Sequence, residues 1–325
     1  MTVRRSLPRR RLLLGAAGAL ACASLGTGAF RPLAGAQGLA VRTRAGLALG
    51  TTVSLTVAGP EAGAVEAALT EAFGAIRAVE AAASLFRANS ALARLNRAGV
   101  LERPDPLLLA PLRYALDLAA ASGGAFDPTV QPLWTLWAEA AARGERPGAA
   151  ALREAVARVG WDRVSASEEA IRLKPGTALT LNGVVQGFAA DRVMAVLEAR
   201  GIRDAFVDTG EFGARGAHPD GTPWRLGLAD PREPARIAAV IEPFAGFAST
   251  SGDYATSFSA DHSDHHIFDP ATGRSPRGLA SVTVTAPSGL AADGLSTAAM
   301  VLGEAAGRDL VGRHPGCAVR FVAKA

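Results

Sequence analysis

The sequence predicts an α+β fold, a single large domain in which helices pack on a mixed sheet. Segments of strand-like alternation and of helical periodicity are interspersed, without the regular strand–helix–strand order of a doubly wound sheet. No Walker loop is present and no Gly-x-Gly-x-x-Gly turn follows a strand, so the main signatures of P-loop and Rossmann proteins are missing. No repeat of fixed period and no break in composition divides the chain.

Helices are predicted where apolar residues recur at spacings of three and four. One segment of this kind ends at Gly123-Gly124, a C-terminal stop signal, and another at Gly201. The predicted helices cover residues 64–85, 107–121, 149–159, 191–200 and 291–302. Alternating apolar residues predict strands at residues 53–57, 171–173, 178–181, 205–208, 224–229, 238–241, 281–285 and 318–322.

Composition and charge exclude several classes of protein. The 325 residues are 49% hydrophobic and 20% charged, which excludes a disordered chain or a collagen and is enough for a large core. The net charge is +4, but residues 1–36 hold six of the 34 basic residues and no acid. The remaining 28 basic and 30 acidic residues give the rest of the chain about −2. No case for nucleic-acid binding remains.

The first 36 residues are predicted to be a signal peptide of the twin-arginine type, followed by one domain at residues 37–325. Arg9-Arg10-Arg11 precedes an uncharged apolar run at residues 12–25, and Ala34-Gly35-Ala36 supplies the small residues of a cleavage site. The alternative is an ordinary secretory signal, in which the arginines set the orientation. Either one implies export, and we expect a periplasmic protein.

The two cysteines predict no internal disulfide. Cleavage after residue 36 removes Cys22 and leaves Cys317 alone. Lipidation of Cys22 would anchor the protein to a membrane, but the residues before it match a lipobox poorly.

Two glycine-containing segments are candidates for ligand binding. Residues 123–130 read Gly-Gly-Ala-Phe-Asp-Pro-Thr-Val and are followed by Trp134 and Trp137. Asp127 either caps a turn or belongs to a backbone that approaches a planar ligand. Residues 181–192 pass from a strand through a glycine-flanked turn into a helix. That turn either presents N–H groups to a phosphate or packs strand against helix tightly.

A polar segment at residues 249–269 holds three of the five histidines, His262, His265 and His266. Zinc binding is one interpretation, although neither a cysteine ligand nor a helical His-Glu-x-x-His spacing accompanies them. The interpretation that we favour is a single histidine in proton transfer, with Asp269 nearby.

Residues 292–297 place Asp293 and Thr297 four residues apart, on one face of a predicted helix. A carboxylate and a hydroxyl there suit Mg²⁺, which prefers oxygen ligands. Alternatively, Asp293 caps the helix by accepting hydrogen bonds near Ser296, and the residues alone favour this cap.

In order and spacing, these segments resemble the FAD:protein FMN transferases, the ApbE family, and particularly its NosX-like branch. The resemblance extends from Gly50-Thr51 to Gly303. The segments that carry it are Ser84-Leu85-Phe86 with Ser90 and Leu95-Asn96, Gly124 to Val130, Gly183 to Arg192, Ser251-Gly252-Asp253-Tyr254, His266 to Gly273, and Ala292 to Thr297.

The resemblance implies a T-fold-like α+β architecture and an exported enzyme. Such enzymes cleave FAD, used as a substrate, and transfer FMN through a phosphoester to a Thr or Ser of a partner flavoprotein, with release of AMP. By analogy with the branch, the partner is expected to be membrane-associated. A divalent ion, Mg²⁺, would neutralise charge on the pyrophosphate.

Carried over residue by residue, the resemblance also implies a site. His266 would accept the proton of the attacking hydroxyl. The metal ligands would be Gly183 through its carbonyl, Asp293, Ser296 through its backbone, and Thr297. The flavin nucleotide would be held by Leu49, Phe86, Ala125, Phe126, Asp127, Thr180, Gln186 and Ile267. The resemblance thus favours ligation over capping for Asp293, and a catalytic histidine over zinc.

The sequence departs from the common family pattern at residues that are expected to bind the nucleotide. Thr180 and Gln186 stand where an Asp and a Lys are usual, and Thr209-Gly210-Glu211 replaces Gly-Gly followed by an acid. Two other functions remain open: an FAD pyrophosphatase, in which water replaces the acceptor hydroxyl, and a flavin-binding or assembly protein without turnover.

Overall fold

The structure, a computed structural model, describes residues 38–324; the predicted signal peptide at residues 1–36 lies outside them. Its centre is a seven-stranded sheet with the order β1-β2-β6-β7-β10-β11-β12, and every neighbouring pair is antiparallel. The strands are β1 (Ala40–Ala48), β2 (Thr51–Gly59), β6 (Asp204–Asp208), β7 (Phe212–Arg215), β10 (Gly246–Gly252), β11 (Leu279–Ala286) and β12 (Ala318–Ala323).

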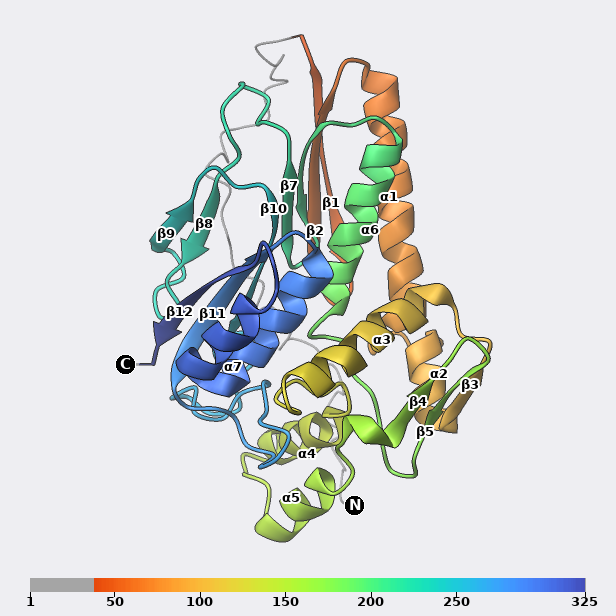
Figure 1. Cartoon of the computed structure of the whole chain (residues 1–325), viewed down its shortest axis with the longest axis vertical. Helices are drawn as coiled ribbons and strands as arrows, with labels where there is room; N and C mark the ends of the chain where they lie inside the picture. Colours follow the sequence, from red (N-terminus) through yellow and green to blue (C-terminus); the bar gives the residue numbers. More distant parts are fainter. Residues whose placement is uncertain (1–37, 325) are drawn as a thin grey trace, which may run out of the picture.

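Three helices cover one face of this sheet: α1 (Ala62–Ala83), α6 (Val185–Ala199) and α7 (Gly289–Gly312). Figure 1 shows α1 and α6 side by side; α1 packs on β1 and β2, α6 on β6 and β7, and α7 on β10 and β11. Side chains on alternate positions of a strand face the same side, so the fully buried Val53, Leu55 and Val57 of β2 all point into the main core. This two-residue period is the pattern that predicts the strand.

The opposite face of the sheet carries a smaller apolar cluster. Phe206 of β6 points away from the helices and lies 5.4 Å from Trp224, ring centre to ring centre. Trp224 precedes a two-stranded sheet of β8 (Leu226–Ala229) and β9 (Ile237–Ile241), which covers this face. Both faces of the central sheet are therefore buried near β6.

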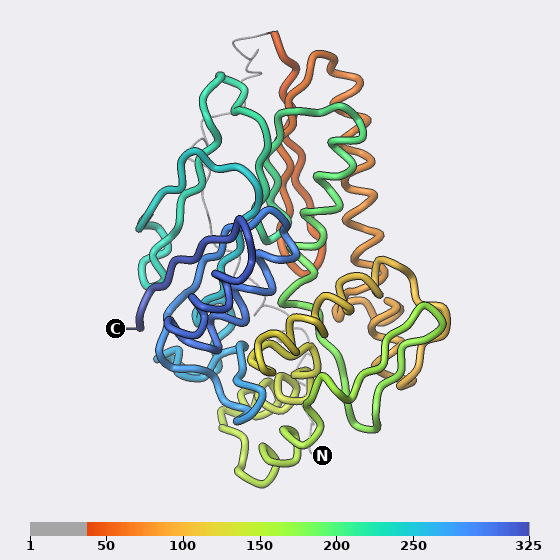
Figure 2. Tube along the Cα trace, in the orientation of Figure 1, coloured from red at the N-terminus to blue at the C-terminus, as the bar shows by residue number. Residues whose placement is uncertain are grey.

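The segment between α1 and α6 forms the other end of the molecule. Figure 2 shows this yellow-to-green stretch gathered below the seven-stranded sheet. It contains α2 (Ala91–Ala98), β3 (Val100–Glu102), α3 (Pro106–Ala121), α4 (Gln131–Ala142), α5 (Ala149–Val156), the 3-10 turn η1 (Trp161–Arg163), β4 (Val164–Ala166) and β5 (Ala170–Leu173). The strands β3, β5 and β4 pair antiparallel in that order.

The α+β fold class is confirmed, with three corrections. The sheets of the described residues are antiparallel throughout, whereas a mixed sheet was expected. Residues 178–181 are extended but pair with no strand, so that prediction was wrong. The last predicted helix continues past residue 302 as far as Gly312, across a break at Gly303, whose φ of 77° and ψ of 179° are not helical.

Within residues 38–324, no helix combines the length and apolarity that a membrane span requires. The predicted twin-arginine signal and the possible lipid anchor at Cys22 fall outside this range and stay predictions.

Candidate functional site

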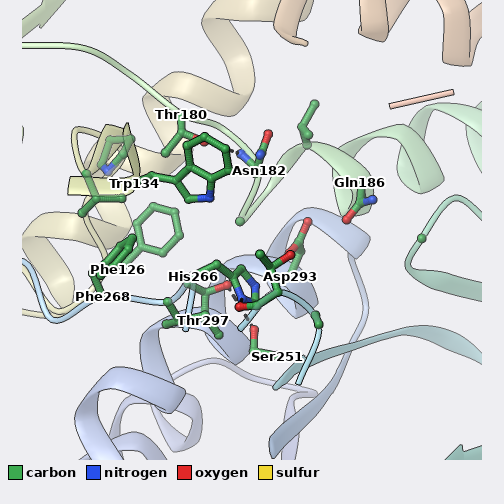
Figure 3. Close-up of a pocket in the computed structure, with 18 of the residues that line it drawn as sticks. Phe126, Trp134, Thr180, Asn182, Gln186, Ser251, His266, Phe268, Asp293 and Thr297 are labelled. Atoms are coloured by element: carbon green, nitrogen blue, oxygen red, sulfur yellow. Dashed lines mark hydrogen bonds between the residues drawn. The ribbon is translucent and has the colours of Figure 1, made fainter. Parts of the chain in front are cut away.

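A cleft of about 320 Å³ opens where the N-terminal half of α6, the first half of α7, the end of β10 and two long loops meet. The loops run from α3 to α4 and from β10 to β11. The predicted site residues that line the cleft are Leu49, Phe86, Ala125, Phe126, Asp127, Thr180, Gly183, Gln186, His266, Ile267, Asp293 and Thr297. Figure 3 shows several of them converging from these separate segments. Ser296 alone of the predicted set is not on the cleft wall.

Gly183 and Asp293, more than a hundred residues apart in the chain, lie on the same wall of the cleft. A β-carbon at Gly183 would lie 3.1 Å from Oγ1 of Thr297. The two helices approach this closely because Gly187 faces Gly289, where a β-carbon on Gly187 would lie only 2.0 Å from the Gly289 carbonyl oxygen. The glycines after residue 182 thus provide the tight packing that was one interpretation of this segment.

Asp293 does not cap its helix. Ser288 is the N-cap, and Asp191 of α6 accepts hydrogen bonds from the Gly289 and Leu290 N–H groups at 2.7 and 2.9 Å. Asp293 lies a turn further on, almost fully buried, and its Oδ2 accepts from the Gly187 N–H at 3.0 Å. Burial raises the pKa of Asp293 to about 7, against the lowering effect of hydrogen bonds from Gly187 and Gln186.

A chain of hydroxyl groups connects α7 to β10. Ser251 Oγ lies 2.9 Å from Ser296 Oγ and 3.2 Å from Thr297 Oγ1, and Ser249 Oγ lies 3.1 Å from Ser296 Oγ. Ser296 also donates to the Asp293 carbonyl at 3.0 Å. Its side chain therefore holds two elements together behind the cleft, while Thr297 lies on the cleft surface.

Glu211, which we did not predict as a site residue, lies on the cleft wall beside this group. Burial and the nearby Asp293 carboxylate raise its pKa well above the ordinary value, although Ser249 and the Thr250 N–H donate hydrogen bonds to it. The sequence carried one signal for it, because Glu211 follows Thr209-Gly210 where the family has an acid after two glycines.

The cleft wall is acidic. Asp127, Glu211 and Asp293 line it, and the described residues on it include no Lys or Arg. A polyanionic ligand would meet like charge here, so binding one needs a cation that the cleft side chains do not supply.

His266 is arranged to accept a proton. Its Nδ1 lies 3.1 Å from the Thr256 carbonyl oxygen, which can only accept, so Nδ1 carries the hydrogen and Nε2 keeps its lone pair. Burial, and then the neighbouring His265, lower the pKa of His266 to about 4. The ring is therefore neutral near pH 7.

Neither of the other two histidines of the segment, His262 and His265, lines the cleft, although the His265 ring lies 6.3 Å from that of His266, centre to centre. His265 is fully buried and its Nε2 contacts the Pro276 carbonyl at 3.1 Å. Asp269, expected near the catalytic histidine, accepts from the Ala271 N–H and the Thr272 hydroxyl within its own turn and does not line the cleft. Among the described residues, no three His, Cys, Asp or Glu side chains form a cluster that could hold a metal, which leaves the zinc interpretation without support.

Asp127 lines the cleft with both carboxylate oxygens engaged. Oδ1 accepts from the N–H and hydroxyl of Thr129, and Oδ2 accepts from the Trp161 N–H at 2.9 Å. The side chain thus fixes the shape of the wall, which was the turn-capping interpretation. Trp137 is buried and donates to the Gly273 carbonyl at 2.9 Å, so it belongs to the core.

Two aromatic rings remain exposed on the cleft wall: Phe86 is 60% exposed and Trp134 is 40% exposed. Phe86 rests on the turn between β1 and β2, where a β-carbon at Gly50 would lie 2.7 Å from the ring. Leu49 in that turn has a φ of 54° and donates its N–H to Glu80 at 3.0 Å. Exposed aromatic faces of this kind suit a planar ligand.

Thr180 and Gln186 also line the cleft. The Thr180 N–H donates to the Pro128 carbonyl at 2.7 Å, which joins this strand-like segment to the loop before α4. The Gln186 side chain lies directly over Gly210, whose φ of 95° and lack of a β-carbon leave room for it.

Fold and site together define an antiparallel α+β protein with an acidic, aromatic-edged cleft of cofactor-binding size and a neutral histidine on its wall. The model of the ApbE family matches residues 49–321, and this chain belongs to that family. It is 32% identical over 294 residues to an FAD:protein FMN transferase of Klebsiella pneumoniae, covering 86% of this chain and 83% of that protein. It is 33% identical over 309 residues to one of Treponema pallidum, covering 86% and 84%.

Solved structures agree. The flavinyl transferase ApbE of Pseudomonas stutzeri superposes with a TM-score of 0.75 at 32% identity, covering 88% of this chain and 92% of that one. The ApbE protein of Thermotoga maritima gives a TM-score of 0.78 at 28% identity, covering 87% and 94%. The expected ApbE architecture is thereby confirmed.

Proposed function

We propose that this protein is an FAD:protein FMN transferase, which attaches FMN to a hydroxyl of a partner protein. The observation that carries the proposal is that one cleft combines an aromatic edge, a cluster of oxygen ligands around Asp293 and Thr297, and a histidine with a free Nε2. This chain aligns with 83% and 84% of the length of the two relatives described above that bear this name.

The reaction is a phosphoryl-group substitution. The oxygen of an acceptor Thr or Ser forms a bond to the phosphorus of the FMN half of FAD. The bond from that phosphorus to the bridging oxygen breaks, and its electron pair leaves with AMP. The hydroxyl proton passes to Nε2 of His266, which is neutral because burial lowers its pKa.

The residues present fit a Mg²⁺ ion. Asp293 and Thr297 offer oxygen ligands next to Gly183, and Glu211 adds a second buried carboxylate close by. The cleft wall carries no Lys or Arg, so the negative charge of a diphosphate requires a cation here. When bound, the ion would neutralise charge on the diphosphate oxygens. In our proposal the Gly183 carbonyl, Asp293 and Thr297 hold it. Ser296, whose hydroxyl bonds Ser251 and the Asp293 carbonyl, supports this group from behind the cleft instead of acting as a ligand.

Phe86, Phe126 and Ile267 give the flavin an apolar contact surface, and Leu49 and Ala125 complete the wall. Because Gln186 stands where Lys is common in the family, nucleotide binding depends on neutral hydrogen bonds and on the cation. Asp127 contributes through the loop that it fixes.

We further propose that the protein acts outside the cytoplasm and that its partner is a membrane-associated flavoprotein. The support is in the sequence: the arginines before the apolar run at residues 12–25 and the resemblance to the NosX-like branch.

The test is a labelling reaction. Purified protein, FAD and Mg²⁺ are incubated with the membrane fraction of a strain of the source organism that lacks this gene, and proteins are separated on a denaturing gel. We expect one or more flavin-fluorescent bands that require both FAD and the enzyme and disappear with EDTA. Release of FMN and AMP in equal amounts without any labelled band would identify a pyrophosphatase instead. FAD binding with neither outcome would favour a flavin-binding protein.

A further inference from the structure

Exposed apolar side chains gather around the mouth of the cleft. Among residues 38–324, the large apolar side chains that are exposed are Leu47 (86%), Phe86 (60%), Trp134 (40%), Trp161 (38%) and Val240 (43%). The first four belong to segments that build the cleft, and we call them the apolar rim. Val240 lies on β9, which contributes no residue to the cleft.

Two members of the apolar rim stand outside the nucleotide site. Phe86 and Trp134 line the cleft, whereas Leu47 and Trp161 do not. Leu47 lies near the end of β1, two residues before Leu49, whose turn contacts Phe86. A nucleotide bound in the cleft therefore gives no reason for Leu47 or Trp161 to be exposed.

The segments that carry the apolar rim are held rigidly. The Trp161 N–H donates to Asp127 Oδ2 at 2.9 Å, and the Gly160 N–H donates to Thr129 Oγ1 at 2.7 Å. On the other side, Leu49 N–H bonds Glu80, which also pairs with Arg87 beside Phe86 at 3.4 Å. Exposed apolar side chains on a fixed backbone mark protein-binding surfaces, and tryptophan is enriched among the residues that contribute most to binding.

We propose that the apolar rim is the docking surface for the acceptor polypeptide, which binds through apolar side chains flanking its reactive hydroxyl. The inference rests on the proposed function, since the acceptor must bring a Thr or Ser to His266 inside the cleft. Phe86 and Trp134 line the cleft, Leu47 lies two residues before the lining residue Leu49, and the Trp161 N–H bonds Asp127 on the cleft wall, so a polypeptide that enters on this side passes next to all four.

A polypeptide fits this surface better than a lipid bilayer does. Membrane surfaces attract clusters of basic side chains. Residues 37–325 carry about −2, and Arg87, the basic residue next to Phe86, is paired with Glu80. Arg44 and Arg77 share a second pocket with Leu47, and Arg44 is paired with Glu66 at 2.7 Å. Two of the three basic side chains beside Leu47 and Phe86 are thus balanced by acids.

Leu47→Ser and Trp161→Ala test the proposal, with Val240→Ser as the matched control, an exposed apolar residue on a strand away from the cleft. The probe is the protein band that the wild type labels in the membrane fraction, and the rate of labelling is followed at limiting and at saturating acceptor. FAD affinity is measured by quenching of flavin fluorescence.

For Leu47→Ser and Trp161→Ala we expect the labelling rate at limiting acceptor to fall about fivefold each. The rate at saturating acceptor and the FAD affinity should stay within about twofold of wild type, as should every value for Val240→Ser. Leu47 is 86% exposed, so its substitution does not endanger folding even if that of Trp161 does.

Unchanged labelling by Leu47→Ser would overturn the proposal, as would equal losses in Val240→Ser. Binding of the wild type to vesicles of phosphatidylethanolamine and phosphatidylglycerol that is lost in Leu47→Ser and Trp161→Ala would assign the rim to a bilayer instead. If the wild type labels no protein, the proposed function itself is wrong. If the wild type labels a protein and the variants label it equally well, only the docking proposal is wrong.

Discussion

Asp293 combines two properties that oppose each other in a folded protein. Its carboxylate is almost fully buried, which disfavours the charged form, and it faces a second acidic side chain, Glu211. Backbone N–H groups of Gly187, at 3.0 Å, and Gln186 offset only part of this cost. A carboxylate kept in such surroundings costs stability, and a bound cation is the natural compensation.

Asp293→Asn is therefore expected to separate function from stability. The amide oxygen can still accept from Gly187, while the charge that would hold the cation is gone. We expect FMN transfer to fall by at least about a hundredfold, with a melting temperature equal to or above that of wild type. Labelling assays and thermal denaturation without added metal measure the two quantities. Asp309→Asn, an exposed residue of the same helix, should change neither. A large loss of stability in Asp293→Asn would contradict this account.

His266 should set the acid limit of the reaction. Burial lowers its pKa to about 4, so the base is already neutral at pH 5 to 8, and protonation removes it only as the pH falls through about 4. We expect His266→Asn to lose transfer by about a hundredfold or more and to abolish this acid limb. The readout is the pH dependence of kcat/KM for the acceptor. His218→Asn, a half-exposed histidine paired with Asp220, serves as control. If kcat/KM of the wild type instead falls with a pKa near 6.5, and this fall is absent in His266→Asn, then burial does not lower the pKa of His266 as described.

At single positions, sequence patterns predicted which residues line the cleft better than they predicted what each side chain contacts. Asp293 was ambiguous because capping depends on where a helix begins. The first N–H groups of α7 are bonded by Ser288, the N-cap, and by Asp191, about a hundred residues earlier. Asp127 was expected to hold the nucleotide, but its carboxylate is occupied by Thr129 and Trp161. A side chain's partner across the fold is not contained in its local sequence.

Between elements, the crossing of α6 and α7 decides whether the site exists. Gly187 and Gly289 touch backbone to backbone, and this contact brings Gly183 against Thr297. The sequence showed Gly183 and Gly187 in a turn with two possible roles. It did not show that Gly289 would face Gly187. Helix ends were predicted within a few residues where a glycine or proline marks them, as at Pro106 and Ala121 of α3. The helix α4 and the strand β1 were missed, since an apolar, tryptophan-rich stretch after a proline and an arginine-rich edge strand show weak periodicity.

Gly187→Ala should disrupt the crossing. Its β-carbon would lie 2.0 Å from the Gly289 carbonyl oxygen, and neither backbone can move without displacing Asp293. We expect the free energy of unfolding to fall by about 3 kcal/mol, at the upper end of overpacking effects, and transfer to be lost with it. Urea denaturation provides the first measurement. Gly63→Ala in α1 is the control, since no heavy atom lies within 4 Å of its new β-carbon and the change should be stabilising by up to about 1 kcal/mol. If the two variants are equally stable, α6 and α7 can move apart at residue 187 without losing free energy of unfolding, which would contradict this prediction.

For the whole molecule, the order of the strands in the sheet could not be predicted from local sequence patterns. β2 pairs with β6, although α1 to α6 and the small three-stranded sheet lie between them in the chain. Only the class of the fold follows from the succession of elements; the pairing follows from which apolar faces meet. The same holds for the contacts that close the molecule around the loop carrying His266.

One such contact joins three distant segments. Asp253, fully buried after β10, accepts two hydrogen bonds at 2.8 Å from Arg232, beyond β8, and lies 3.1 Å from Lys324 at the C-terminal end. Lys324 also donates to the carbonyl of His262 in the loop that leads to His266. Burial alone would raise the pKa of Asp253, but Arg232 and Lys324 hold it below the ordinary value.

Asp253→Asn should therefore weaken the contact among these three segments. It leaves two partly buried cations without their counter-charge, and we expect the free energy of unfolding to fall by about 3 kcal/mol at pH 7. Because the pKa is lowered in the folded state, the stabilisation is complete above the unfolded value of about 4 and is lost as the pH falls below it. The difference between wild type and variant, followed by urea denaturation, should thus be constant from about pH 8 to 5 and shrink toward pH 3. Glu304→Gln breaks an ion pair with Arg308 whose side chains are 60% and 58% exposed, and it should cost no more than about 0.5 kcal/mol at any pH. A pH-independent difference for Asp253→Asn would mean that packing, and not the charge of Asp253, joins the three segments.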